Sequence, residues 1–200
     1  LNPSDRLWNN WTSLRRQGHK STATLYTDWL STARPKQLTP KGDWHIWLIL
    51  AGRGWGKTRT GATDAVLYAL RNPEVQVAVV TPTFGDLRRV AFEGVSGILK
   101  TMPRECLLSG RGQGYNSSAA EIRLHNGSKI MGFSATEPDR LRGPQFHRAW
   151  CDELAAWRYP EAFDQLMFAL RLGDKPQCVI TTTPKPTPMI RQLMDRSDCI

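Results

Sequence analysis

An apolar run, a glycine-rich turn and a Gly-Lys-Thr sequence follow one another at residues 48–58, and they constrain the fold most strongly. The stretch reads Leu-Ile-Leu-Ala-Gly-Arg-Gly-Trp-Gly-Lys-Thr. The apolar run is typical of a buried strand, and good helix formers follow the lysine. Glycines let successive backbone N–H groups converge on an anion, and a helix N-terminus adds partial positive charge. The pattern therefore predicts a strand, a phosphate-binding loop and a helix.

Within this loop, Lys57 is expected to reach the β- and γ-phosphates of a nucleotide, and the Thr58 hydroxyl to ligate Mg²⁺. The usual motif has a glycine four residues ahead of the Gly-Lys pair, where this chain has Ala51, so we interpret the stretch as a variant loop. A tight turn whose lysine faces solvent is the alternative. The expected nucleotide-binding residues of the loop are Gly52, Arg53, Gly54, Trp55, Gly56, Lys57, Thr58 and Arg59.

A second chemical feature is the acidic pair Asp152-Glu153, which follows the apolar run at 147–151. A phosphate-binding-loop enzyme needs a carboxylate at the end of another core strand to position Mg²⁺, and Asp152 fits that role. Glu153 could accept a proton from the water that attacks the γ-phosphate. Many solvent-facing strand ends carry such acids, so the catalytic interpretation depends on the loop at 52–58.

The order of elements predicts an α/β fold, namely a phosphate-binding-loop (P-loop) NTPase of the additional-strand, catalytic-glutamate type. We expect a central, mainly parallel sheet flanked by helices, a β-hairpin insertion at 120–133 and a helical N-terminal segment. The strand at 75–81 allows an arrangement in which an extra strand separates the loop strand from the acidic strand. A further strand at 177–183 ends in Thr181-Thr182-Thr183-Pro184, where Thr182 and Thr183 could sense the γ-phosphate. Threonines also simply favour strands.

The remaining segments give the expected domain organisation. Residues 1–45 form a helical N-terminal segment and connector, with two helices separated near Gly18, and residues 46–200 form the P-loop ATPase core. One helix is expected from Phe84 to Met102, with Val90 and Val95 on its apolar face. Another is expected from Pro160 to about Leu172, and the glycine-rich stretch 104–118 is expected to be an ordered but mobile loop.

Composition favours an anionic partner. The formal net charge is +9, from 27 Lys and Arg against 18 Asp and Glu, and nucleic acid is the commonest partner of such a chain. No apolar run approaches the roughly 20 residues that span a bilayer, and we expect a cytoplasmic protein without membrane association. The four cysteines lack metal-ligand spacing and are expected to be reduced. Because the chain begins at Leu1, we expect an excised or incomplete domain.

Several of these elements together resemble the ATPase domain of the large terminase subunit of tailed phages or prophages. The resemblance implies a motor that hydrolyses ATP with Mg²⁺ to package double-stranded DNA into a procapsid. It implies a ring, commonly of five subunits, on the portal protein in the host cytoplasm, with the small terminase subunit as a partner. Full-length large terminases also carry a nuclease domain, which we expect to be missing here. The matching stretches are residues 33–38, 48–59, 138–143, 150–157 and 181–184.

The same resemblance assigns roles to individual residues. Lys57 and Thr58 would hold phosphate and Mg²⁺, Asp152 the metal, and Glu153 would activate water. The resemblance also implies an in-loop arginine, two coupling residues, an adenine-reading glutamine and an arginine finger donated to the neighbouring subunit. The respective candidates are Arg53, Thr182 or Thr183, Gln37, and Arg140 or Arg142.

Two other functions fit parts of the pattern. Another nucleic-acid translocase or helicase-like ATPase would use the same loop, acidic pair and basic charge, but a single ATPase core and the Arg53 loop disfavour it. A nucleotide-dependent assembly protein with little turnover would have no need of Glu153.

Overall fold

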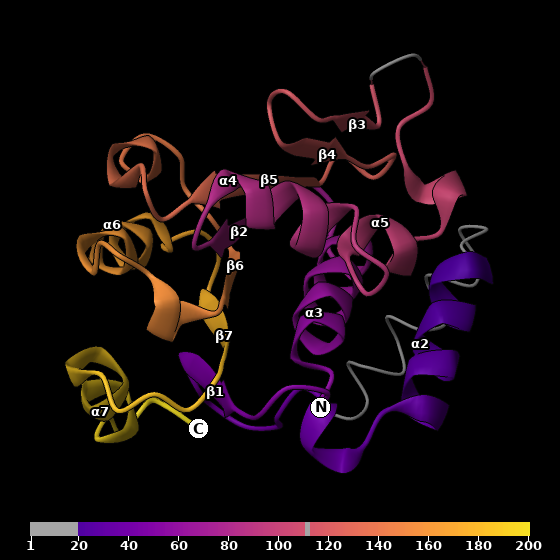
Figure 1. Cartoon of the computed structure of the whole chain (residues 1–200). Helices are drawn as coiled ribbons and strands as arrows, with labels where there is room; N and C mark the ends of the chain where they lie inside the picture. The colour runs from indigo at the N-terminus through magenta and orange to yellow at the C-terminus, as the bar shows by residue number, and fades with distance from the viewer. Residues whose placement is uncertain (1–19, 111–112) are drawn as a thin grey trace.

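A mixed seven-stranded sheet forms the centre of the part of the molecule that the structure describes (Figure 1). The computed structural model describes residues 20–110 and 113–200. The strands lie in the order β1-β7-β6-β2-β5-β4-β3, and only β3 and β4 at one edge run antiparallel to their neighbours. The strands are β1 (Ile46–Leu50), β2 (Gln76–Thr81), β3 (Tyr115–Asn116), β4 (Glu121–Arg123), β5 (Lys129–Ser134), β6 (Arg148–Asp152) and β7 (Gln177–Thr182).

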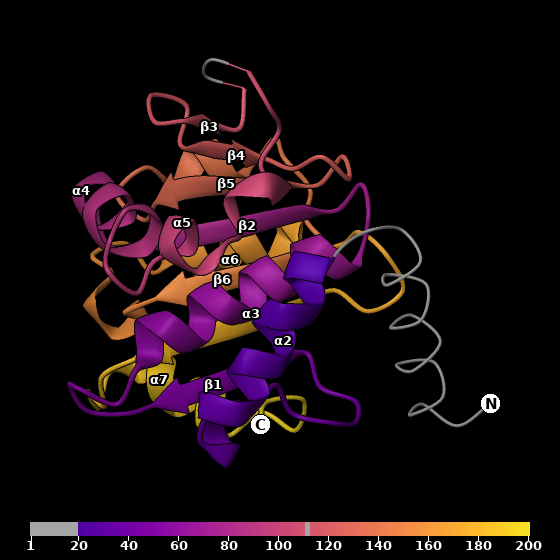
Figure 2. The same ribbon diagram turned by 90° about the vertical axis from the view of Figure 1, so that its right-hand side faces the viewer.

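Helices cover both faces of this sheet. In Figures 1 and 2, α3 lies on one face with α2 and α5 beside it, while α6 and α7 lie on the other. The helices are α2 (Lys20–Thr32), α3 (Lys57–Arg71), α4 (Phe84–Asp86), α5 (Ile98–Thr101), α6 (Glu161–Ala169) and α7 (Pro188–Met194). A π-helix, η2 (Leu87–Phe92), and four 3₁₀ turns, η1 (Pro35–Gln37), η3 (Arg104–Cys106), η4 (Pro138–Leu141) and η5 (Leu154–Ala156), complete the described elements. The predicted α/β fold with a parallel sheet and a hairpin is confirmed.

The central strands are apolar along their whole length because both of their faces are buried. In β2, Val77 and Val79 pack into the cluster beneath α3, whereas Ala78 and Val80 pack into the cluster beneath α6. Small residues let α3 approach the sheet closely. A Cβ atom built on Gly61 would lie 2.1 Å from Nε1 of Trp150 in β6, so only glycine fits there.

The strand order differs from the expectation in one respect. The strand between the loop strand β1 and the acidic strand β6 is β7, whereas β2 lies on the far side of β6. Thr181 of β7 consequently pairs with Ile49 on one side and with Asp152 on the other. The crossover connections between strands decide this order, and the succession of strands along the chain does not reveal it.

The helix expected from Phe84 to Met102 is also interrupted. It divides into α4, η2 and α5, with a turn at residues 93–97. A Cβ atom on Gly94 would lie 2.4 Å from the Val90 carbonyl oxygen, so the glycine allows the chain to fold back on the preceding turn. Val90 and Val95 are therefore not in the core, since they are 41% and 95% exposed.

The N-terminal helices and the helix after Pro160 agree with the expectations only in part. The second N-terminal helix corresponds to α2, whereas the first falls within residues 1–19 and lies outside the description. The helix expected from Pro160 ends at Ala169. The division at residue 45 and the mobility of the 104–118 loop stay predictions. Across residues 20–110 and 113–200, no helix is long and apolar enough to cross a membrane.

Candidate nucleotide-binding site

The carboxyl ends of β1, β7 and β6 lie side by side, and they bring the chemically active segments together. Because the three strands are parallel, the loop after β1, the threonines after β7 and the acidic pair after β6 emerge at the same edge. Ligands bind at this edge in open α/β sheets. The sheet thus joins two motifs that lie far apart in the chain, at residues 52–58 and 152–153, as the sequence predicted.

The loop itself has the backbone shape that the glycines predicted. Gly54 and Gly56 have φ angles of +77° and +89°, a left-handed conformation that other residues adopt only with strain. Gly56 directly precedes α3, so the positive end of that helix faces the loop. Ala51 does not have a positive φ, and its N–H donates to the Thr182 carbonyl oxygen at 3.1 Å. The alanine therefore ends the strand without strain, as the variant-loop interpretation required.

Lys57 links the loop to the acidic pair. Its side chain is buried, and Nζ donates to the Gly52 carbonyl oxygen at 3.1 Å. The same Nζ lies 3.5 Å from Oε1 of Glu153. The two motifs found in the sequence thus meet in direct contact, and the lysine does not face solvent as the alternative interpretation required.

Thr183 holds the Glu153 carboxylate. Oε2 of Glu153 accepts hydrogen bonds from the backbone N–H and the hydroxyl of Thr183, both at 3.1 Å. The Glu153 backbone has a φ of +48°, which is unusual for a residue with a side chain and is found at functional sites. Thr182 has a different place, since its hydroxyl accepts from the N–H of Ala155 at 3.0 Å. Of the two predicted threonines, Thr183 contacts the acidic pair, while Thr182 supports the turn that follows it.

Asp152 is buried beside a threonine that the sequence did not single out. Thr181 donates a hydrogen bond from Oγ1 to Oδ1 of Asp152 at 2.8 Å, and accepts one from Nε1 of Trp150 at 2.7 Å. Because an indole N–H can only donate, the Thr181 hydroxyl hydrogen is left for the carboxylate or for the Cys151 carbonyl oxygen, which is more distant at 3.3 Å. Burial raises the pKa of Asp152 to about 6, although the Thr181 hydrogen bond acts in the opposite direction. The sequence predicted the three threonines beside the Asp152 strand end, and strand pairing identifies Thr181 as the one directly opposite Asp152.

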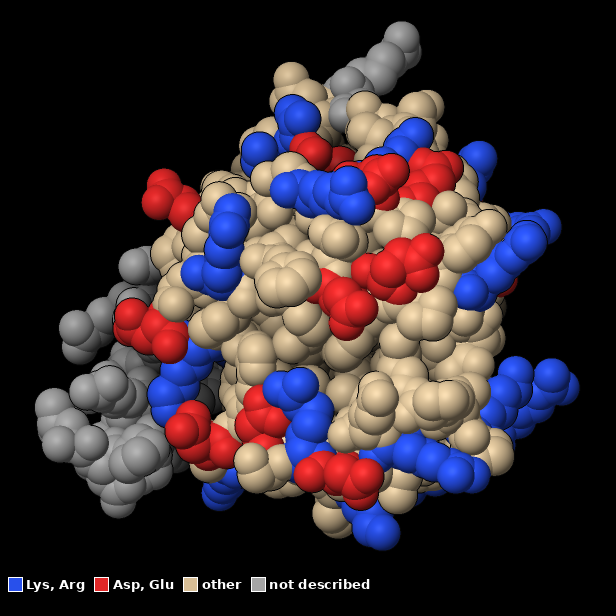
Figure 3. Space-filling model, turned by 90° about the vertical axis from the view of Figure 1, so that its left-hand side faces the viewer, with Lys and Arg blue, Asp and Glu red and all other residues tan. Residues whose placement is uncertain are grey.

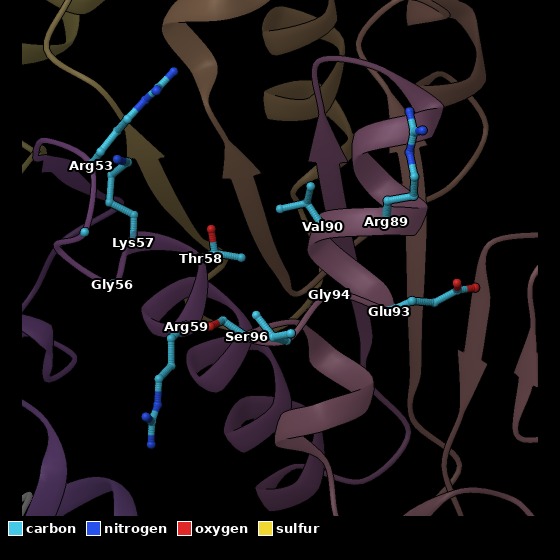
Figure 4. Close-up of a pocket in the computed structure, with 12 residues that line it drawn as sticks. Arg53, Gly56, Lys57, Thr58, Arg59, Arg89, Val90, Glu93, Gly94 and Ser96 are labelled. Carbon is cyan, nitrogen blue, oxygen red and sulfur yellow. The ribbon is translucent and has the colours of Figure 1, made fainter.

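A cavity of about 830 Å³ lies between the loop and the segment after η2 (Figure 4). Arg53, Lys57, Arg59 and Arg89 give its described lining a positive charge that only Glu93 offsets, which suits an anionic ligand. The acidic pair does not line this cavity and adjoins it through the contact between Lys57 and Glu153. The lining residues are Arg53, Gly54, Gly56, Lys57, Thr58, Arg59, Arg89, Val90, Glu93, Gly94, Val95 and Ser96.

The wall opposite the loop was not predicted. Arg89, Val90 and Glu93 belong to η2 and the turn after it, and in Figure 4 Val90 points toward the loop while Arg89 and Glu93 extend away from it. The sequence could have indicated this wall. Because β2 ends at the same sheet edge as β1, the segment that follows β2 must run past the site.

The other predicted binding residues surround the loop. Gln37 is buried against it and donates from Nε2 to the Trp55 carbonyl oxygen at 3.3 Å. Arg59 stacks over the ring of Trp29 in α2, with its Cζ 5.6 Å from the ring centroid. Arg53 is exposed and extends away from the loop in Figure 4.

The two candidate arginine fingers are not brought to the loop of their own chain. Arg140 and Arg142 are exposed on η4 and just after it, and this turn follows β5, which β2 separates from the acidic strand β6. Each pairs with an acid of its own turn, Arg140 with Glu137 and Arg142 with Asp139 at 3.2 Å. On the face of the molecule that carries α6 and α7, basic and acidic side chains alternate (Figure 3).

The residues present fit a magnesium–nucleotide complex better than a protein-only metal site. In the described ranges, no three His, Cys, Asp or Glu side chains gather closely enough to hold a metal ion. Mg²⁺ usually takes one or two protein oxygens and completes its shell with phosphates and water. Asp152 and Thr58 could supply those protein oxygens, and the loop could supply the phosphate-binding amides.

The fold and the site define a P-loop NTPase with an additional strand between the loop strand and the acidic strand. Within that class, the chain belongs to the family of large terminase subunits. Residues 48–197 match the family described as terminase large subunit, T4likevirus-type, N-terminal. This match confirms the resemblance seen in the sequence and favours a phage DNA-packaging ATPase over a helicase-like ATPase. No curated protein matches the chain in sequence.

Solved structures share this fold at low sequence identity. The ATPase domain of the Thermus phage P74-26 large terminase superposes with a TM-score of 0.64 and 18% identity, covering 81% of this chain and 69% of that one. The large terminase of another thermophilic bacteriophage, in complex with ADP, gives 0.55 and 17%, covering 82% and 38%. The bacteriophage Phi-29 genome packaging motor assembly gives 0.55 and 12%, covering 78% and 52%. The chain thus spans well under half of the ADP-bound terminase.

Proposed function

We propose that this domain hydrolyses ATP to drive double-stranded DNA into a procapsid. The observation that carries the proposal is the contact of 3.5 Å between Nζ of Lys57 and Oε1 of Glu153. The contact supports the proposal because a terminal phosphate that binds to this lysine would lie next to the carboxylate, which could then accept a proton from the attacking water. Membership of the large terminase family and the positively charged cavity support the same conclusion.

Each side chain of the site has a separate task in this proposal. The loop amides and Lys57 bind the β- and γ-phosphates, and Lys57 offsets the charge on the transferring phosphoryl group. Phosphate binding to Lys57 frees Oε1 of Glu153, which then accepts a proton from the attacking water. Thr183 fixes Oε2 of the same carboxylate, so the base keeps its orientation while Oε1 acts.

Thr58 and Asp152 are the residues that would hold Mg²⁺. When bound, the ion would neutralise charge on the β- and γ-phosphate oxygens. The Thr181 hydroxyl directs one oxygen of Asp152 into a fixed hydrogen bond, which orients the carboxylate.

The assembly of the motor is also part of the proposal. Arg140 or Arg142 would act as the finger for a neighbouring subunit in a ring, since both are exposed and follow β5, which three strands separate from the loop strand β1. The partners would be double-stranded DNA, the portal protein and the small terminase subunit, in the host cytoplasm. The net charge of +9 suits DNA, and a packaging motor assembly is among the similar structures.

The test is the variant Glu153→Gln, which keeps the size of the side chain and removes the proton acceptor. We expect ATP binding close to that of the wild type and a loss of hydrolysis on the order of a hundredfold or more. Isothermal titration and phosphate release measure the two properties. Glu161→Gln, at an exposed position of α6, is the control and should leave both unchanged. Undiminished turnover in Glu153→Gln would exclude Glu153 as the base.

A further inference from the structure

Gln37 lies beneath the phosphate-binding loop, and its amide group is fully occupied by this chain. It ends the turn η1 and is 7% exposed. Its Nε2 donates to the Trp55 carbonyl oxygen at 3.3 Å and to Oγ1 of Thr60 at 3.2 Å. Its Oε1 accepts from the backbone N–H of Arg34 at 3.0 Å and from Nε of Arg34 at 3.2 Å. A glutamine amide has two donor hydrogens and two acceptor lone pairs, so all four positions are used.

These contacts fall on the two residues that directly precede Lys57. Thr60 donates from Oγ1 to the Gly56 carbonyl oxygen at 3.0 Å, so the Gln37 amide reaches Gly56 through one hydroxyl. A Cβ atom on Gly56 would lie only 2.8 Å from Nε2 of Gln37, which shows how closely the amide packs under the loop. The glutamine thus contacts the backbone whose left-handed turn points the following amides toward a phosphate.

Arg34 also contacts Trp55, through both its backbone and its ring. Its guanidinium donates from Nη2 to the Trp55 carbonyl oxygen, and its Cζ lies 5.2 Å from the centroid of the Trp55 ring. Arg34 also precedes the proline that begins η1, whose fixed φ holds the turn in shape. Arg34 and Gln37 therefore form one unit, hereafter the Arg34–Gln37 clamp, that holds Trp55 by its backbone and its ring.

We propose that the Arg34–Gln37 clamp sets the shape of the phosphate-binding loop and that Gln37 does not read the nucleotide base. This inference rests on the proposed nucleotide binding and deepens it. A glutamine that reads adenine must present a free donor and acceptor to the ring, and here that would break at least two of the four intramolecular hydrogen bonds. Both residues are thus positioning residues, which act on the phosphates through the loop backbone.

The two roles predict different ligand dependence. A clamp affects every ligand that carries a triphosphate, because it acts on the loop that binds phosphate. A base reader affects adenine nucleotides alone. Its hydrogen bonds distinguish adenine from other bases, so their loss weakens the binding of ATP and leaves the binding of GTP and triphosphate unchanged. Titrations with ATP, GTP and inorganic triphosphate, each with Mg²⁺, therefore separate the two roles.

The variant is Gln37→Met, which has a similar length and lacks the amide. We expect all three ligands to bind more weakly by the same factor, on the order of tenfold, because the loop loses hydrogen bonds that fix its shape. Gln177→Met is the matched control. Its amide donates to the Trp44 carbonyl oxygen at 2.8 Å and accepts from Arg148, at the opposite end of β7 from the site. The control should lower the free energy of unfolding and leave all three affinities unchanged.

A second variant, Arg34→Lys, keeps the charge but loses the planar group that bonds and stacks, so it should weaken the three ligands equally as well. It also serves if Gln37→Met fails to fold. A loss confined to ATP would overturn the inference and make Gln37 an adenine reader. Unchanged affinities in both variants would overturn it too, because the loop would then keep its shape without the clamp. If the wild-type chain bound none of the three ligands, the proposed function itself would fail.

Discussion

The ionisation of Asp152 gives a prediction whose size follows from the structure. Asp152 is 4% exposed, and burial raises its pKa from 3.8 to about 6, with the Thr181 hydrogen bond partly offsetting that effect. The difference is roughly two pH units. At about 1.4 kcal/mol per unit, it corresponds to about 3 kcal/mol of unfolding free energy.

The sign follows from which state holds the proton. The carboxyl group of Asp152 loses its proton near pH 3.8 in the unfolded chain but near pH 6 in the folded one. Between these values the folded state binds the extra proton, so the free energy of unfolding that Asp152 contributes is fully present below pH 3.8. It is lost as the pH rises through about 6. At neutral pH the ionised, buried Asp152 therefore lowers the free energy of unfolding of the wild-type protein, and Asp152→Asn avoids this loss.

Urea denaturation of both proteins between about pH 4 and pH 7 measures this loss. We expect the free energy of unfolding of Asp152→Asn, relative to the wild type, to rise by roughly 2–2.5 kcal/mol between these two pH values, because part of the effect is already spent at pH 4. Asp43→Asn, at a side chain that is 84% exposed and pairs with Lys175 on the surface, is the comparison variant for a carboxylate outside the core. A flat difference for Asp152→Asn would refute the burial argument.

Two further predictions concern Thr181 and the candidate arginine fingers. Thr181→Val leaves Nε1 of Trp150 without an acceptor and removes the hydrogen bond to Asp152, so urea denaturation should show a loss of about 1–3 kcal/mol, whereas Thr181→Ser should stay close to the wild type. Mixing wild-type subunits with Arg140→Ala or Arg142→Ala subunits should reduce ATP turnover faster than in proportion to the mutant fraction. A strictly proportional loss for both variants would mean that neither arginine acts across subunits.

The local patterns in the sequence were sufficient to predict the main parts of the site. The apolar run with its glycines required a strand and an anion-binding turn, and the acidic pair required the end of a second strand. Because parallel strands end at one edge, the meeting of Lys57 with Glu153 could be expected without coordinates.

What the sequence could not supply depended on how strands pair and where turns fold back. The insertion of β7 beside β1 is decided by crossovers, and with it which of the three threonines expected beside the Asp152 strand end lies opposite Asp152. The apolar spacing predicted a continuous helix through Val95, but Gly94 allows a turn there and leaves Val95 exposed beside the cavity. The engagement of Gln37 with the loop required the tertiary contact with Trp55.

The most direct test of the central claim is a structure of this chain with Mg²⁺ and a non-hydrolysable ATP analogue. The account predicts that the γ-phosphate contacts Nζ of Lys57 and that Oε1 of Glu153, with the carboxylate still held by Thr183, lies beside that phosphate. A triphosphate bound away from the loop, or one whose γ-phosphate lies remote from both Asp152 and Glu153, would contradict it.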